Sequence, residues 1–155
     1  TCTDIDRKAG AALAEIAGID AEKFAHEMFR AGSNLGSKTP EEIIHQDFKR
    51  FSVNELTIGI GQINSMDAEE LKEIEKKVEA ELENERSGGN LDMIFMLFTD
   101  IISESSEVFF TGKDSAETIS NAFNLDKTTE GSVILPGVVS RKKQFLPAIV
   151  EALQQ

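Results

Sequence analysis

Tryptophan and tyrosine are absent from the 155-residue sequence, and Cys2 is its only cysteine. A single cysteine excludes an internal disulfide and a cysteine–histidine metal cluster. This usage is typical of a reducing compartment, so we expect a cytoplasmic protein. No apolar run approaches the roughly 18 residues that a membrane helix needs, and the polar N-terminus does not resemble a signal peptide. We therefore expect no membrane span and no membrane partner.

The charge balance is strongly acidic, because 28 Asp and Glu residues against 16 Lys and Arg residues give a formal net charge of -12. A surface of this sign repels nucleic acid and anionic lipid, so neither is an expected partner. Apolar residues still make up 40% of the chain, with ten phenylalanines, which is enough for a core at this length. A local group of basic side chains can nevertheless hold a small anion.

The beginning of the chain has the pattern of two short helices. Thr3 marks the first helix start, apolar residues then recur at helical spacing, and Gly18 suits the helix end. Asp20 is suited to cap the second helix. The small and polar residues at 31–37 predict a linker or hinge after it.

The rest of the chain alternates helical and strand patterns. Helices are expected from 39, at 67–88, at 114–123 and at 145–153, and strands at 48–53, 56–63, 91–98, 107–111 and 132–135. The predicted fold class is α/β, a mixed sheet of about five strands with flanking helices, preceded by an N-terminal helical hairpin. We assign residues 1–34 to the helical lead-in and 35–155 to the main domain. The strand order is not predicted.

Residues 140–144, Ser-Arg-Lys-Lys-Gln, form the most unusual local feature, because three cations directly precede the last predicted helix. Arg141, Lys142 and Lys143 there oppose the helix dipole, whose N-terminal end attracts anions. A bound phosphate resolves this conflict, with the arginine as a planar fork and the lysines as point charges. The alternative interpretation is a basic turn in solvent.

Two further lysines are candidate cations. Lys49 lies between Phe48 and Phe51 in the first predicted strand, where the alternative is an edge-strand lysine that discourages aggregation. Lys38, in the predicted hinge, is a weaker candidate and is equally consistent with a solvated loop lysine.

The remaining polar residues indicate no metal site. His26 and His45 lack the i, i+4 histidine spacing of a metal-binding helix, so we interpret both as ordinary helix residues. Three aspartates form no recognisable metal box: Asp67, Asp92 and Asp100. Thr99 and Asp100 end a buried strand, where a functional group is common, but Asp100 is equally suited to cap a turn.

Several motifs occur together in one order along the chain. Gly-Val-Val precedes Ser-Arg-Lys-Lys-Gln at 137–144, Asp47, Lys49 and Phe51 form an Asp-x-Lys-x-Phe pattern, and Gln-Ile-Asn at 62–64 is followed by Asp67. Together they resemble the C-terminal domain of family II (manganese-dependent) inorganic pyrophosphatases, within the DHH phosphoesterase superfamily.

This resemblance implies a hydrolase that converts pyrophosphate into two phosphates. It implies that an N-terminal DHH domain holds Mn or Co together with Mg, and that the C-terminal domain binds the substrate. The residues carried over as substrate-binding are Arg141, Lys142 and Lys49. No catalytic residue and no metal ligand is expected in this chain. Residues 1–34 would be the last helices of the metal-binding domain, and we expect the chain alone to bind no Mn and to hydrolyse nothing measurable.

Two other functions remain open at this point. The chain could belong to a related DHH exopolyphosphatase, although the compact basic signature favours pyrophosphate. It could also be a non-catalytic module that binds an anion and regulates another protein.

Overall fold

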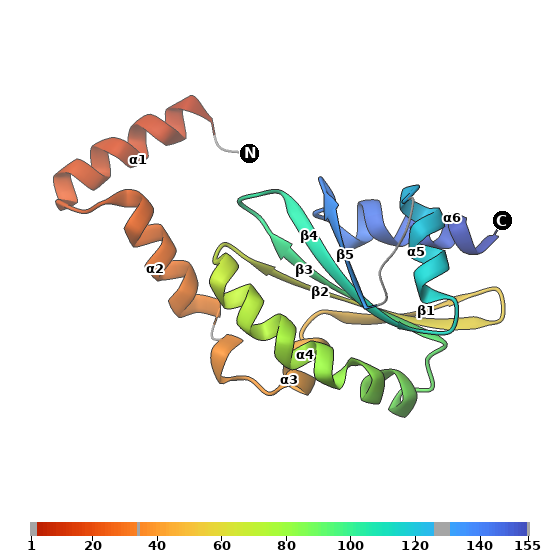
Figure 1. Cartoon of the computed structure of the whole chain (residues 1–155). Helices are drawn as coiled ribbons and strands as arrows, with labels where there is room; N and C mark the ends of the chain where they lie inside the picture. The colour runs from red at the N-terminus through yellow and green to blue at the C-terminus, as the bar shows by residue number, and fades with distance from the viewer. Residues whose placement is uncertain (1–2, 34, 126–130, 155) are drawn as a thin grey trace. The chain divides into compact units, whose positions relative to one another are not determined.

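The computed structural model describes residues 3–33, 35–125 and 131–154, and the chain separates into two compact units, Thr1–Asn34 and Leu35–Gln155 (Figure 1). Cys2 lies outside the described residues, as does Asn34 at the boundary between the units. No helix in the described ranges is both long and apolar enough to cross a bilayer.

Two helices, α1 (Asp4–Ala17) and α2 (Ala21–Ser33), make up the first unit, as predicted. Thr3 caps α1 in a reciprocal capping box with Asp6, and Gly18 ends this helix in the left-handed region at φ 65°. The linker is predicted to begin at residue 31, but α2 continues through the small residues at 31–33. No side chain of α1 is buried.

The second unit is built on a five-stranded sheet with the order β1-β2-β3-β4-β5. The strands are Phe48–Val53 (β1), Leu56–Ser65 (β2), Met93–Asp100 (β3), Ser105–Gly112 (β4) and Ser132–Pro136 (β5). β2 and β3 are parallel, and the other neighbouring pairs are antiparallel. The predicted mixed α/β sheet is therefore confirmed.

Helices cover both faces of this sheet (Figure 1). One face carries η1 (Leu35–Ser37), α3 (Pro40–His45) and α4 (Ala68–Gly88), and the other carries α5 (Ser115–Phe123), η2 (Arg141–Phe145) and α6 (Leu146–Gln154). The central strand β3 is buried on both faces. Met96 and Phe98 pack on the α4 side, and Phe95 and Leu97 on the α6 side.

Two glycines in β2 allow close packing on the α4 side. A Cβ atom on Gly59 would collide with the Phe48 ring, and one on Gly61 would collide with the sulfur of Met96. Glycine inside a strand is typical of such a close approach.

Two further details of the prediction are wrong. The third strand was expected from residue 91, but the Leu91 N–H donates to the Arg86 carbonyl at the end of α4 (2.9 Å), so the strand begins at Met93. Asp114, with Glu117 three residues later, has the spacing of a capping box, which predicts that the Asp114 carboxylate caps the helix expected at 114–123. Asp114 adopts a left-handed conformation at φ 61° instead and makes no side-chain cap bond.

Candidate functional site

The sequence predicts that the basic segment at 140–144 precedes the last helix. In the structure this segment is itself the start of the helix. Arg141–Phe145 forms a π-helical turn that leads directly into α6. The Ser140 hydroxyl caps this turn by accepting the Lys143 N–H (3.2 Å). The cations therefore lie within the first turn of the helix.

The Gln144 carboxamide ties the preceding residues to this turn. Its oxygen accepts the backbone N–H groups of Val139 and Ser140, each at 3.0 Å. Its nitrogen donates to the Gly137 carbonyl at 2.7 Å. One side chain thus holds the backbone of the whole connection between β5 and η2.

Arg141 is buried, with 9% of its side chain exposed, and its guanidinium is held against β1 and β2. Nη1 donates to the Asp47 and Ile60 carbonyls, the latter at 3.4 Å, and Nη2 donates to the Asp47 carboxylate at 2.9 Å. These bonds compensate for the water that the charged group loses on burial. Asp47 therefore fixes both the position and the orientation of the Arg141 guanidinium.

A buried polar network supports the backbone of the same segment. The Gln62 carboxamide accepts the Arg141 N–H (3.0 Å) and donates to Thr99 Oγ1 (2.8 Å) and to the Val139 carbonyl (3.1 Å). Thr99 contacts Ser106 Oγ at 2.8 Å, and that hydroxyl donates to the Val138 carbonyl. Thr99, one of the polar residues that end the buried strand, is therefore a structural member of this network.

Lys49 lies on the same face of the sheet as Arg141. It is the cross-strand partner of Ile60, whose carbonyl accepts from Arg141. Side chains directly opposite each other in an antiparallel pair share a face, and Ile60 packs on the α6 side. Lys49 is exposed, as is Lys142, which follows Arg141 in the π turn. The structure therefore brings Lys49 and Arg141 to one edge of the sheet.

The weaker candidate Lys38 lies close to the start of β1. Its Nζ donates to Gln46 Oε1 at 2.7 Å, one residue before Asp47. Asp100, by contrast, caps a turn. Burial favours its neutral form, but hydrogen bonds from Ser103 and from the Ile102 N–H outweigh this and lower the pKa of Asp100.

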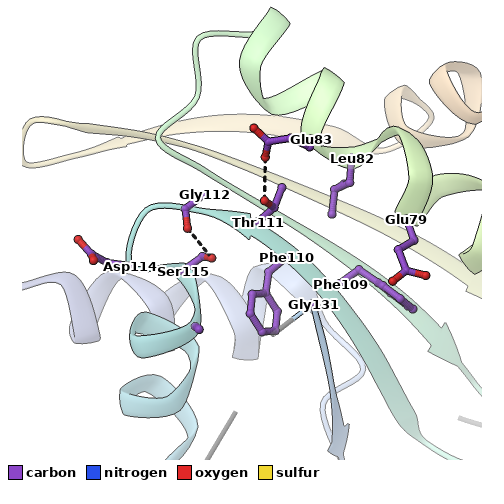
Figure 2. A pocket seen from close by; sticks show the side chains of 11 residues that line it. Glu79, Leu82, Glu83, Phe109, Phe110, Thr111, Gly112, Asp114, Ser115 and Gly131 are labelled. Atoms are coloured by element: carbon purple, nitrogen blue, oxygen red, sulfur yellow. Dashed lines mark hydrogen bonds between the residues drawn. The ribbon is translucent and has the colours of Figure 1, made fainter. Parts of the chain in front are cut away.

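A cavity of about 570 Å³ lies near Thr111 and Gly112, at the C-terminal end of β4 (Figure 2). Ser106 lies at the other end of this strand. Glu79 and Glu83 line the cavity, and hydrogen bonds from Arg86 and Thr111 lower the pKa of Glu83 to about 2. This acidic lining disfavours an anion, so the cavity does not extend the cation cluster.

One group in the described ranges could hold a metal ion: Glu41, His45 and Glu85. It lies on α3 and α4, which cover the sheet face opposite to Arg141. The residues around Arg141 that the structure describes offer no such group.

Sequence reasoning missed two residues of this arrangement. In the sequence, Asp47 and Gln62 are identified only as members of the family motifs. In the structure Asp47 positions the Arg141 guanidinium, and Gln62 positions the Arg141 backbone. They lie 94 and 79 residues before it in the chain. No local pattern indicates pairings at such separations.

Comparison with known proteins gives concordant matches. The family model of the DHHA2 domain matches residues 26–152. The chain is 42% identical to an Exiguobacterium sp. protein assigned as a manganese-dependent inorganic pyrophosphatase, over 98% of this chain and 48% of that protein. It is 40% identical to a cobalt-dependent inorganic pyrophosphatase of Clostridium perfringens, over 99% of this chain and 28% of that protein.

The fold is also found among solved structures. A crystal structure of a Methanococcus jannaschii protein assigned to the family II inorganic pyrophosphatases superposes with a TM-score of 0.74 at 40% identity. The match covers 99% of this chain and 49% of that protein. The chain thus spans about half the length, or less, of these relatives. The resemblance found in the sequence is confirmed, and the chain belongs to the DHHA2 domain family.

Proposed function

We propose that this chain is the substrate-binding C-terminal domain of a manganese-dependent inorganic pyrophosphatase that hydrolyses pyrophosphate to two phosphates. Arg141, Lys142 and Lys49 would bind a phosphate group of the substrate. The observation that carries the proposal is the position of Arg141 and Lys49, which approach the same residue of β2, Ile60, from two separate parts of the chain.

The hydrogen bonds of Arg141 support a binding role. Asp47 occupies the end of the guanidinium, through Nη1 and Nη2. Within the part of the chain that the structure describes, the edge formed by Nε and the second Nη2 hydrogen donates no further hydrogen bond. Such an edge presents two parallel N–H groups, which match two oxygens of a phosphate. Asp47 is then a positioning residue that orients this edge of the guanidinium.

The two lysines complement this fork. Lys49 and Lys142 are exposed. Folding therefore does not remove water from their ammonium groups, which can reach the substrate as point charges. Cations fixed around a phosphoryl group stabilise the charge that develops during transfer. The chain's own contribution would therefore be binding, orientation and charge stabilisation.

The metal ions would be held by a different part of the full-length protein. Manganese or cobalt, with magnesium, would supply an activated water when bound, and the N-terminal DHH domain would hold them. The unburied apolar side chains of α1, among them Leu13 and Ile16, which are 64% and 84% exposed, suit packing against that domain. Residues 1–34 would then be its final helices, and the protein would act in the cytoplasm.

The binding role is tested by calorimetric titration of this chain with pyrophosphate. We expect Arg141→Ala to weaken binding at least tenfold, since a charged hydrogen bond contributes about 1.5–3 kcal/mol. Lys142→Ala and Lys49→Ala should weaken it several-fold. Lys77→Ala, an exposed lysine on α4, is the matched control. Because Arg141→Ala also removes the bond to Asp47, the exposed Lys142 provides the test if that variant fails to fold. Unchanged affinity in the Lys142 and Lys49 variants would refute the proposal.

The activity is tested on the full-length protein. Phosphate release from pyrophosphate in the presence of Mn²⁺ is expected for that protein and not for this chain alone. Tripolyphosphate is the comparison substrate. A clear preference for it over pyrophosphate would identify an exopolyphosphatase instead, and turnover by this chain alone would contradict the division of labour proposed here.

A further inference from the structure

The seam between α3 and α4 carries a group of potential ligands that has no part in the anion site. Glu41 and His45 are four residues apart on α3 and therefore share one face of the helix. Glu85, on α4, approaches from 40 residues further along the chain. One ligand atom from each of the three residues lies within 4.8 Å of the other two.

Two of these side chains already contact each other. The His45 Nε2 atom lies 3.0 Å from Glu85 Oε2, and 18% of the Glu85 side chain is exposed. The imidazole is also oriented by an edge contact with the Phe48 ring, at 5.5 Å between centroids. The imidazole and one carboxylate are thus held in place, and Glu41, which is exposed, can rotate toward them.

The chemistry of the three donors suits a divalent transition metal. Imidazole nitrogen with two carboxylates is a ligand set that Zn²⁺ accepts, with water in the remaining position. At ligand distances of about 2.0–2.2 Å, two donors 3.0 Å apart subtend an angle of about 90° at the ion. This is narrower than the tetrahedral angle of zinc, so the two donors must separate by roughly 0.4 Å when the ion binds. Two carboxylates facing one imidazole also leave an excess of negative charge that a cation neutralises.

The supporting elements are well packed. Ile43 and Ile44 of α3 are fully buried in the core that α4 shares, so the backbone beneath the ligands is fixed. α3 also leads within two residues to Asp47, the partner of Arg141. An ion joining α3 to α4 would therefore steady the residue that orients the guanidinium.

We propose that Glu41, His45 and Glu85 form a binding site for a divalent transition-metal ion such as Zn²⁺, which clamps α3 to α4. This site departs from the expectation that the chain holds no metal, which considered only paired histidines and separate aspartates. Its function is structural, because it fastens the segment that precedes β1.

The experiment is calorimetric titration of the chain with Zn²⁺, on a Cys2→Ser background so that the thiol makes no contribution. We expect one ion per chain. His45→Ala and Glu85→Gln should each weaken binding at least tenfold, and Glu41→Gln several-fold. His26→Asn, which removes the other imidazole, is the matched control and should bind as the parent does. Circular dichroism of every variant confirms that it is folded.

A second measurement separates this site from loose surface binding. Zn²⁺ should raise the thermal midpoint of the parent chain, because an ion that binds only the folded state stabilises it. It should not raise that of Glu85→Gln. The exposed Glu41→Gln variant removes one ligand without touching the core, so it provides the test if His45→Ala unfolds. Zn²⁺ binding that survives Glu41→Gln and Glu85→Gln unchanged, or that is lost in His26→Asn, would overturn the proposal.

Discussion

The two units of the chain contain similar amphipathic helices but use them differently. In α1 the large apolar side chains remain in solvent, with Ile5 79%, Leu13 64% and Ile16 84% exposed. In α4 the equivalent positions are buried, with Ile74 and Val78 at 1% and 0% exposure. The pattern and the caps therefore determine the helix, whereas burial of its apolar face depends on a partner.

Removal of a central side chain from the second unit should have the largest effect. Phe95 is fully buried and packs against Phe110 and Phe145, at centroid distances of 6.3 and 5.6 Å. We expect Phe95→Ala to lower the free energy of unfolding by about 3–5 kcal/mol, because it leaves a cavity in a packed core. Urea denaturation followed by circular dichroism measures this change.

The matched change in the first unit is Leu13→Ala. Its side chain is largely exposed, so we expect a change within about 0.5 kcal/mol in the same measurement. A loss comparable to that of Phe95→Ala would mean that α1 is packed in solution, and the contrast between the two units would be wrong.

The contrast is sharpened by removing a polar group from the second unit. Gln62→Ala deletes the carboxamide that joins Thr99, Val139 and Arg141, and leaves buried groups without partners. We expect a loss of about 1–3 kcal/mol in the free energy of unfolding. Asn64→Ala, two residues along the same strand and exposed, should change stability little. Equal effects of the two substitutions would contradict the role assigned to the network.

The smallest expected effect depends on pH. Burial, followed by the negative charge of Glu107, raises the pKa of Glu75 from 4.5 to about 6. The folded protein therefore binds this proton more tightly than the unfolded chain does. Its stabilising contribution is complete below pH 4.5 and is lost as the pH rises through 6.

Glu75→Gln should consequently stabilise the protein at pH 7.5 but not at pH 4. Because Glu75 is only half-buried, solvent screening limits the gain to less than about 1 kcal/mol. Thermal denaturation at the two pH values measures it, with the exposed Glu73→Gln on the same helix as the control. A gain of equal size at both pH values would assign the effect to packing instead of charge.

Local features of the fold were predictable from the sequence. Thr3 and Thr39 form the capping boxes that their spacing indicates. The strands predicted at 56–63 and 91–98 correspond to β2 and β3, apart from shifts of two residues at their ends. Each of these signals acts within a few residues. Asp114 shows the limit, because a left-handed backbone keeps its carboxylate from the cap position.

The cations of the candidate site were predictable from the sequence, but the residues that hold Arg141 in place were not. The cluster at 140–144 and Lys49 were conspicuous as local sequence, whereas the bond of Arg141 to Asp47 exists only after β1, β2 and η2 have assembled. Likewise, the pairing of His45 with Glu85 depends on the packing of α3 on α4. Contacts between distant residues require the tertiary structure, and no periodicity in the sequence encodes them.

The grip of Gln144 on the connection from Gly137 to Ser140 has a consequence for affinity. A flexible basic loop would lose conformational freedom each time it closed on an anion, and that loss would weaken every binding event. Here folding itself removes this freedom, so the π turn presents its cations in a preorganised backbone. Loosening the loop by Gln144→Ala should therefore weaken the proposed binding of pyrophosphate in a calorimetric titration, although the Gln144 carboxamide bonds only to backbone groups of this connection.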